Sequence, residues 1–180
     1  MSWFCIGTNA ACVIPACMLY SRKYIPDAFI TVCTGVASFM FHGAELEGWP
    51  VGFTPMRNTD VILANLLVLH TINMLLHTKN RFENSLCMLP PVIYGANVKV
   101  FWRFAVLCTY GTGCSIYIFT NRNLYILKWY ITGLSIIFGE IFFFTFGNQK
   151  ESEYSWYHGA HHIAAFTAQA CFLASLPEPS

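Results

Sequence analysis

The chain has 180 residues, of which 56% are hydrophobic and only 11% are charged. Because soluble domains carry about 25% charged residues, this composition excludes an ordinary soluble protein and predicts a membrane protein. Ten basic and nine acidic residues give a net charge of +1, so no nucleic acid is expected as a partner. The eight cysteines show neither metal-binding nor disulfide spacing and are predicted to be small apolar packing residues.

Apolar runs long enough to cross a bilayer follow one another along the chain. A membrane helix needs roughly 20 mostly apolar residues. The fourth run is the weakest because Pro90 and Pro91 interrupt it, although membrane helices tolerate proline where neighbours satisfy the freed carbonyls. We expect an all-α integral membrane protein, a seven-transmembrane helix bundle forming one domain over residues 1–180. The expected helices lie roughly at residues 2–20, 26–46, 58–77, 82–98, 101–120, 124–146 and 155–176.

Charges between the runs predict the orientation of the bundle, because connections rich in Lys and Arg face the cytosol. The first, third and fifth connections hold Arg22, Lys23, Lys79, Arg81, Arg122 and Lys128. The other side holds Arg57, Lys99, Lys150, Glu45, Glu47, Glu151 and Glu153. The N-terminus is therefore expected outside or in the lumen and the C-terminus in the cytosol, in the plasma membrane or a secretory-pathway membrane. No basic residue precedes the first run, which favours a retained helix over a signal peptide.

With seven spans, polar groups from three helices meet at the outer face. Ser38 and His42 stand one helical turn apart, Asp60 begins the third run, and His158 and His162 stand one turn apart at the start of the seventh. Three neutral imidazoles and a water make an open tetrahedral zinc site, so these histidines are the expected zinc ligands. Zinc lowers the pKa of its water to about 7. Asp60 would take the proton or orient a histidine, and Ser38 would donate a hydrogen bond to the water or an oxyanion.

Each of these residues also has a simpler interpretation. A His-x-x-x-His pair at a helix end is often interfacial, Ser38 could pack helices, and Asp60 could complement a helix dipole. Glu45 is either the partner of a ligand histidine or an exposed loop acid. His161 could replace either His158 or His162 as a ligand. Its position on the helix turns it to the side, so it is expected to lie next to the metal ligands.

Further ionisable residues lie within the apolar runs. Arg103 and Glu140 both fall in the outer half and are expected to form a structural ion pair. His70 and His77 lie deeper on the third run, where they are expected to pack or to lie at the inner interface.

The arrangement of Ser38, His42, Asp60, His158 and His162 resembles that of the CREST superfamily of seven-helix membrane proteins. It is most similar to the transmembrane protein 8 and myomaker family. The likeness is carried by Phe41–Glu45, Met56–Ile62, Tyr154–His162 and Leu176-Pro177.

The resemblance implies zinc on His42, His158 and His162, with Asp60 and Ser38 beside an activated water. It also implies cleavage of lipid esters or amides, as in alkaline ceramidases and a GPI-directed phospholipase A2. The long spacing between His42 and Asp60 argues against ceramide. Gly43-Ala44-Glu45 replaces the Ala-Cys-Asp of the family, which alters the surroundings of the metal.

We therefore expect a zinc-dependent hydrolase of membrane lipids, phospholipase-like or ceramidase-like, acting at the outer or lumenal leaflet. The alternative is a non-enzymatic, myomaker-like membrane-fusion or membrane-organising protein with a structural zinc site. A receptor would need larger outer loops, and a proton-relay transporter would need a line of acids through the bilayer. Both rank below the first two.

Overall fold

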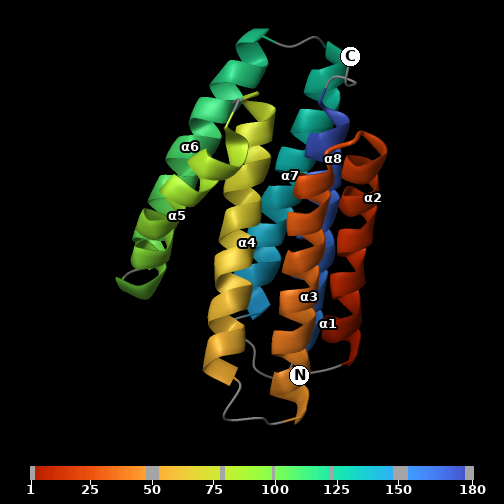
Figure 1. Cartoon of the computed structure of the whole chain (residues 1–180), viewed down its shortest axis with the longest axis vertical. Coiled ribbons are helices and arrows are strands. Elements are labelled where there is room, and N and C mark those ends of the chain that lie inside the picture. The colour runs from red at the N-terminus through yellow and green to blue at the C-terminus, as the bar shows by residue number, and fades with distance from the viewer. Residues whose placement is uncertain are drawn as a thin grey trace.

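The computed structural model describes residues 3–47, 53–77, 80–98, 100–121, 124–147 and 154–176. Within these residues every regular element is a helix, which confirms the expected all-α class. The elements stand side by side as a bundle (Figure 1). They are α1 (Trp3–Thr8), the 3₁₀ turn η1 (Asn9–Cys12), α2 (Val13–Ser21), α3 (Ile25–Glu47), α4 (Phe53–Leu75), α5 (Arg81–Val98), α6 (Val100–Asn121), α7 (Leu124–Gly147) and α8 (Tyr154–Ala174).

The helices lie at the apolar runs, with two local differences from the expected bounds. Helix α4 begins at Phe53 rather than at residue 58, and it carries Pro55 in its first turn. Proline is favoured there because the first N–H groups of a helix have no partner to lose. The first run is divided into α1, η1 and α2. Pro15, the third residue of α2, has no N–H to donate to the carbonyl of Ala11, which fits the 3₁₀ turn directly before α2.

Two helical stretches of the described chain, Trp3–Ser21 and Ile25–Glu47, are long and apolar enough to cross a membrane. The 23 residues of α3 extend about 34 Å at 1.5 Å per residue, slightly more than the roughly 30 Å hydrocarbon core of a bilayer. Length and composition are weak evidence by themselves, because buried helices of soluble proteins share them. The distribution of side chains over the surface is therefore the more informative property.

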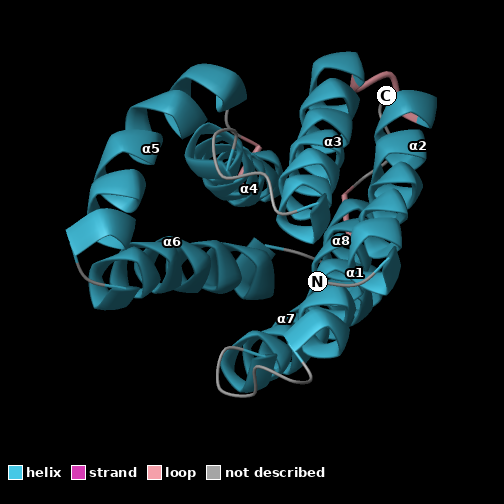
Figure 2. Ribbon diagram, turned by 90° about the horizontal axis from the view of Figure 1, so that it is seen from below, coloured by secondary structure: helices cyan, strands magenta, loops and turns pink. Residues whose placement is uncertain are grey.

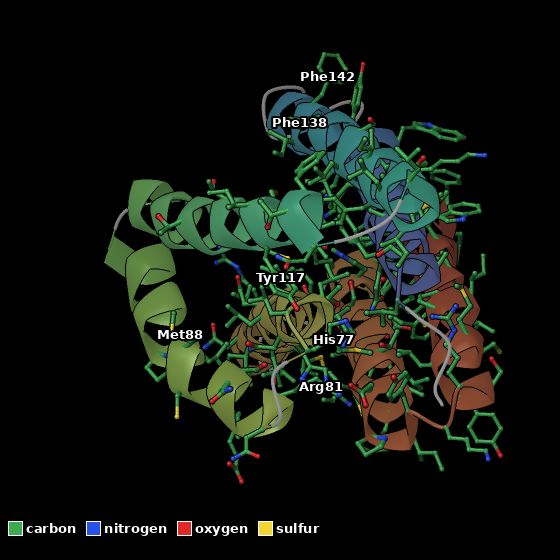
Figure 3. The ribbon with its side chains drawn as sticks, turned by 90° about the horizontal axis from the view of Figure 1, so that it is seen from above. His77, Arg81, Met88, Tyr117, Phe138 and Phe142 are labelled. Atoms are coloured by element: carbon green, nitrogen blue, oxygen red, sulfur yellow. The ribbon has the colours of Figure 1, made fainter. Side chains whose placement is uncertain are left out.

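Several polar side chains are buried in the bundle, while several large apolar ones are exposed on its surface. Ser38 and His42 of α3 are buried, whereas Phe39 between them is 51% exposed. Phe138 and Phe142 project from α7 away from the other helices (Figure 3) and are 70% and 53% exposed. Soluble monomers rarely expose large apolar patches, so this surface suits a lipid environment.

Helices α4 and α8 connect the parts of the bundle. Helix α8 packs along α7 and also contacts α1 and α2, whereas α4 packs against α3, α5 and α6 and also contacts α8. Seen from below, α5 and α6 lie on one side of α4, with α3 and α8 on the other (Figure 2). The largest apolar cluster joins α2, α4, α6 and α8 through Leu19, Leu75, Ile118 and Leu173. It lies toward the end of the molecule where α8 ends.

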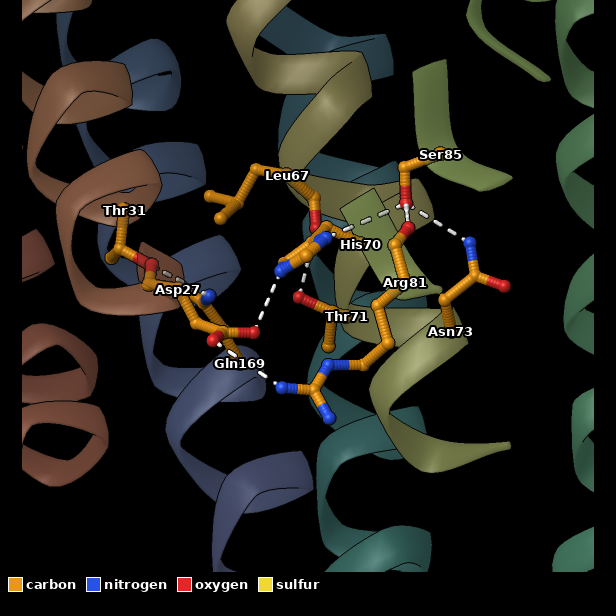
Figure 4. Close-up of polar contacts among 9 residues, drawn as sticks. All are labelled: Asp27, Thr31, Leu67, His70, Thr71, Asn73, Arg81, Ser85 and Gln169. Carbon is orange, nitrogen blue, oxygen red and sulfur yellow. Dashed lines mark hydrogen bonds and ion pairs between the residues drawn. The ribbon is translucent and has the colours of Figure 1, made fainter. Parts of the chain in front are cut away.

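A buried polar network fastens α5 to α3 and α4 (Figure 4). Nε2 of His70 lies 2.6 Å from Oδ1 of Asp27, and Nη2 of Arg81 lies 3.5 Å from Oδ2 of the same carboxylate. Ser85 approaches Nδ1 of His70 at 3.5 Å and accepts a hydrogen bond of 3.0 Å from Asn73. His70 therefore packs inside the bundle, which is the first of the two positions expected for it.

Candidate metal centre

Most of the predicted site residues gather at one end of the bundle. Helix α3 ends there, and α1, α4 and α8 begin there (Figure 1). His42 lies near the last turn of α3, Asp60 lies in the early turns of α4, and His158 and His162 lie near the start of α8. Ser38 shares the buried side of α3 with His42 because four residues complete about one turn.

The three histidines lie in direct contact. Nε2 of His42 lies 3.1 Å from Nε2 of His158. The ring centroids of His158 lie 4.7 Å from those of both His42 and His162, and the rings of His42 and His162 are 5.1 Å apart. In a tetrahedral zinc site with Zn–N distances of about 2.0–2.1 Å, two ligand nitrogens lie about 3.3 Å apart. The separation of His42 and His158 therefore fits two ligands of one ion.

Glu45 holds the ring of His42 in an orientation that suits metal binding. Its Oε2 lies 2.7 Å from Nδ1 of His42. Because a carboxylate accepts the proton of Nδ1–H, the lone pair of His42 is left on Nε2, which faces His158. Metal-binding histidines usually donate their other N–H to a carboxylate or carbonyl in this way. Of the two interpretations of Glu45, the structure supports the one in which it contacts His42, a predicted ligand.

Ser38 and Asp60 lie beside the histidines. Oγ of Ser38 lies 3.5 Å from Nε2 of His162, at the limit of hydrogen-bond distance. The partly buried carboxylate of Asp60 interacts with Ser38, His42 and His161. The two residues with expected proton-transfer and hydrogen-bonding roles therefore border the histidine group.

Helix α1 contributes two residues that the sequence patterns do not single out. Sγ of Cys5 and ring nitrogens of His42 and His162 all lie within 4.8 Å of one another, so this buried group could hold a metal ion. Thr8 donates a 2.7 Å hydrogen bond to the carbonyl of Cys5, and its Oγ1 lies 3.3 Å from Nδ1 of His162. Cys5 is fully buried, as expected of a packing residue, and it also belongs to this candidate metal group. The sequence feature that could have indicated Cys5 is its position at the start of the first apolar run, at the same end of the bundle as His158.

The remaining predicted residues lie around this group or outside the described part. Nδ1 of His161 lies 3.0 Å from Oε1 of Glu140, beside the site as expected. The side chain of Arg103 lies outside the described residues, so its ion pair with Glu140 stays a prediction. His77 is exposed just after α4. Also outside the described residues are Lys79, Lys99, Arg122, Lys150, Glu151, Glu153 and Pro177.

The family of the chain follows from a match over most of its length. A family model described as "Protein of unknown function (DUF3522)" matches residues 1–163. The chain belongs to the DUF3522 family. The matched residues run from before Cys5 to just past His162, so the DUF3522 region contains the whole candidate metal centre. No curated protein sequence matches the chain.

Proposed function

We propose that this DUF3522 protein is a zinc-dependent hydrolase that cleaves an ester or amide bond of a membrane lipid. The observation that carries the proposal is the contact of three histidines from α3 and α8, with Asp60 and Ser38 beside them. The resemblance to the CREST superfamily, and within it to the transmembrane protein 8 and myomaker family, supports the same chemistry.

The donor set suits zinc and hydrolysis. Neutral imidazoles are preferred zinc ligands, and His42, His158 and His162 would hold the ion. A zinc ion there would supply Lewis-acid chemistry and an activated water at neutral pH. Asp60 would accept a proton from the attacking water, and Ser38 would donate a hydrogen bond to the oxygen of the lipid carbonyl.

The surface of the bundle supports a lipid as substrate. Its exposed face includes Val36 and Phe39 on α3, within two turns of His42, and Ile163 next to His162. A bilayer-embedded bundle of seven spans with its N-terminus outside or in the lumen brings the histidines to the outer or lumenal leaflet. An acyl chain would then reach the site laterally between helices. This position fits the plasma membrane or a membrane of the secretory pathway.

The proposal is tested by comparing metal content and lipid hydrolysis in the purified full chain. In mixed micelles of phospholipids and ceramides, the zinc-loaded protein should release fatty acid. Asp60→Asn should reduce the rate by about 10²–10⁴-fold, the usual contribution of a general base, and retain the zinc. His158→Ala should lose both zinc and activity, whereas Glu47→Gln, a change of an exposed acid on α3, should lose neither. No fatty acid from any of these lipids, or full activity in Asp60→Asn, would overturn the proposal.

A second function is favoured by the position of Cys5. If four protein ligands surround the ion, as in structural zinc sites, the metal fastens α8 to α1 and α3 in a membrane-organising or fusion-promoting protein. His42→Ala should then unfold the bundle, and Asp60→Asn should leave the cellular activity intact. Loss of that activity in a folded Asp60→Asn protein excludes this alternative.

A further inference from the structure

We propose that the thiolate of Cys5 is a fourth ligand of the metal, so that α1 controls access of water to the ion. This inference rests on the proposed function, because it assigns a regulatory group to the same centre. Nothing in the His-x-x-x-His pattern or in the DUF3522 match points to a sulfur ligand.

The first support is the distance from Cys5 to the histidines. With Zn–S of about 2.3 Å and Zn–N of about 2.0–2.1 Å, a sulfur and a nitrogen on a tetrahedral ion lie about 3.6 Å apart. The ligand atoms of Cys5, His42 and His162 lie within 4.8 Å of one another. A closing movement of about 1 Å is enough to bring them to ligand separation, which side-chain rotation can supply.

The second support is a glycine that brings α1 close to α8. A Cβ atom on Gly159 would lie 2.7 Å from Cε1 of Phe4 and 3.3 Å from Cα of Cys5. A side chain at this position would collide with the ring of Phe4 and crowd the backbone of Cys5, so the glycine favours the close approach of α1. Gly159 directly follows His158, so the approach places Cys5 at the helical turn that carries the histidine pair.

The third support is the hydrogen bond chain through Thr8. The single proton of its hydroxyl is donated to the carbonyl of Cys5 at 2.7 Å. The same hydroxyl oxygen lies 3.3 Å from Nδ1 of His162 and must therefore accept a hydrogen bond from it. This places a proton on Nδ1 of His162 and the lone pair on Nε2. Thr8 thus couples the backbone of Cys5 to the ring orientation of His162. A buried cysteine that only fills space needs neither this link nor a facing glycine.

A sulfur ligand changes what the centre can do. Three histidines and a thiolate complete a tetrahedral zinc site and leave no position for water. Hydrolysis would then require Cys5 to leave the ion by a movement of α1 relative to α8. With Cys5 bound, the centre would be closed to water; with Cys5 displaced, one position would open to water.

The test uses the full chain in detergent with cobalt in place of zinc, because a cobalt–thiolate bond absorbs in the near-ultraviolet and a cobalt–imidazole bond does not. The wild-type protein should bind cobalt and show this band. Cys5→Ser should lose the band, whereas Cys12→Ser and Cys171→Ser, changes at two other buried cysteines, should retain it. Cobalt binding without the band, or a band that survives Cys5→Ser, overturns the role of Cys5 and leaves the proposed function standing. Failure to bind cobalt or zinc overturns both.

A measurement without any variant covers the case in which Cys5→Ser fails to fold. Zinc-edge X-ray absorption of the wild-type protein should show one sulfur at about 2.3 Å together with nitrogens at about 2.0–2.1 Å. A first shell of nitrogen and oxygen alone would contradict a sulfur ligand.

Discussion

Glu45 is placed to raise the metal affinity of the candidate centre through one hydrogen bond to His42. Its carboxylate fixes the proton of His42 on Nδ1 and increases the basicity of Nε2. The bond is short at 2.7 Å, and Glu45 is only 19% exposed in its side chain, so little water competes for it. The charge of this carboxylate also offsets part of the positive charge of a bound ion.

Glu45→Gln should therefore weaken zinc binding by about 10–100-fold, the usual effect of losing such a partner. A competition titration against a chelator of known affinity measures the change. Glu47→Gln, on the same helix but exposed, should leave the affinity unchanged. Equal affinities of the wild-type protein and Glu45→Gln would show that Glu45 does not orient a ligand.

The three histidines could be predicted from the sequence because His158 and His162 are separated by one turn, and because the four expected spans between residues 58 and 146 return the chain to the end at which His42 lies. Glu45 could be placed near His42 because both lie on one helix. Cys5 could not be assigned to the site, because its approach depends on the packing of α1 against α8 at Gly159. Asp27 and His70 are 43 residues apart, and no local pattern links them.

At the scale of the helices, close packing of the first run against α3 depends on Gly35. A Cβ atom there would lie 2.3 Å from Sγ and 2.9 Å from Cβ of Cys12, and 3.3 Å from the backbone oxygen of Asn9. Because the Cβ of Cys12 is fixed to the backbone, rotation of that side chain cannot remove its 2.9 Å contact. Gly43 lies on the same helix with nothing within 4 Å of its Cβ position.

Gly35→Ala should lower the free energy of unfolding by about 1–3 kcal/mol, the usual cost of overpacking. Gly43→Ala should raise it by up to about 1 kcal/mol, because alanine favours the helix. Unfolding of both variants in detergent, followed by circular dichroism, gives the comparison. If the two substitutions have the same effect, the contact between η1 and α3 is not as tight as described.

The polar network around Asp27 also stabilises the packing of the helices, because it joins α5 to α3 and α4. Removing Asp27 leaves His70 and the partly buried Arg81 without the carboxylate that both contact. Asp27→Ala should cost about 3–5 kcal/mol of unfolding free energy, as expected when one partner of a buried ion pair is lost. Glu83→Gln, at an exposed position on α5, is the control and should be neutral. A neutral Asp27→Ala would show that the network does not stabilise the fold.

The positions of the helices can be predicted from the apolar runs, each of about the length expected for one helix. No sequence pattern indicates the interruption at Asn9–Cys12, although Pro15 supplies its local cause. Helix α4 begins earlier than expected because Phe53–Pro55 resembles a turn in sequence. Its proline is accommodated in the first helical turn.

At the scale of the whole molecule, the proposed orientation places the α3–α4 connection outside and the α6–α7 connection in the cytosol. A glycosylation acceptor inserted between α3 and α4 should be modified in cells, and one inserted between α6 and α7 should not. The reverse pattern would put the histidines at the cytosolic leaflet, where the proposed lipid substrate would lie on the wrong side.

The metal content of the purified full chain tests the central claim most directly, since both the hydrolase and the structural alternative require an ion on the histidines. Elemental analysis of protein from zinc-replete cells should give about one zinc per chain, with most of it lost in His162→Ala and all of it retained in His77→Ala. A wild-type protein without zinc, or equal zinc in the wild type and His162→Ala, would contradict a metal centre between α3 and α8.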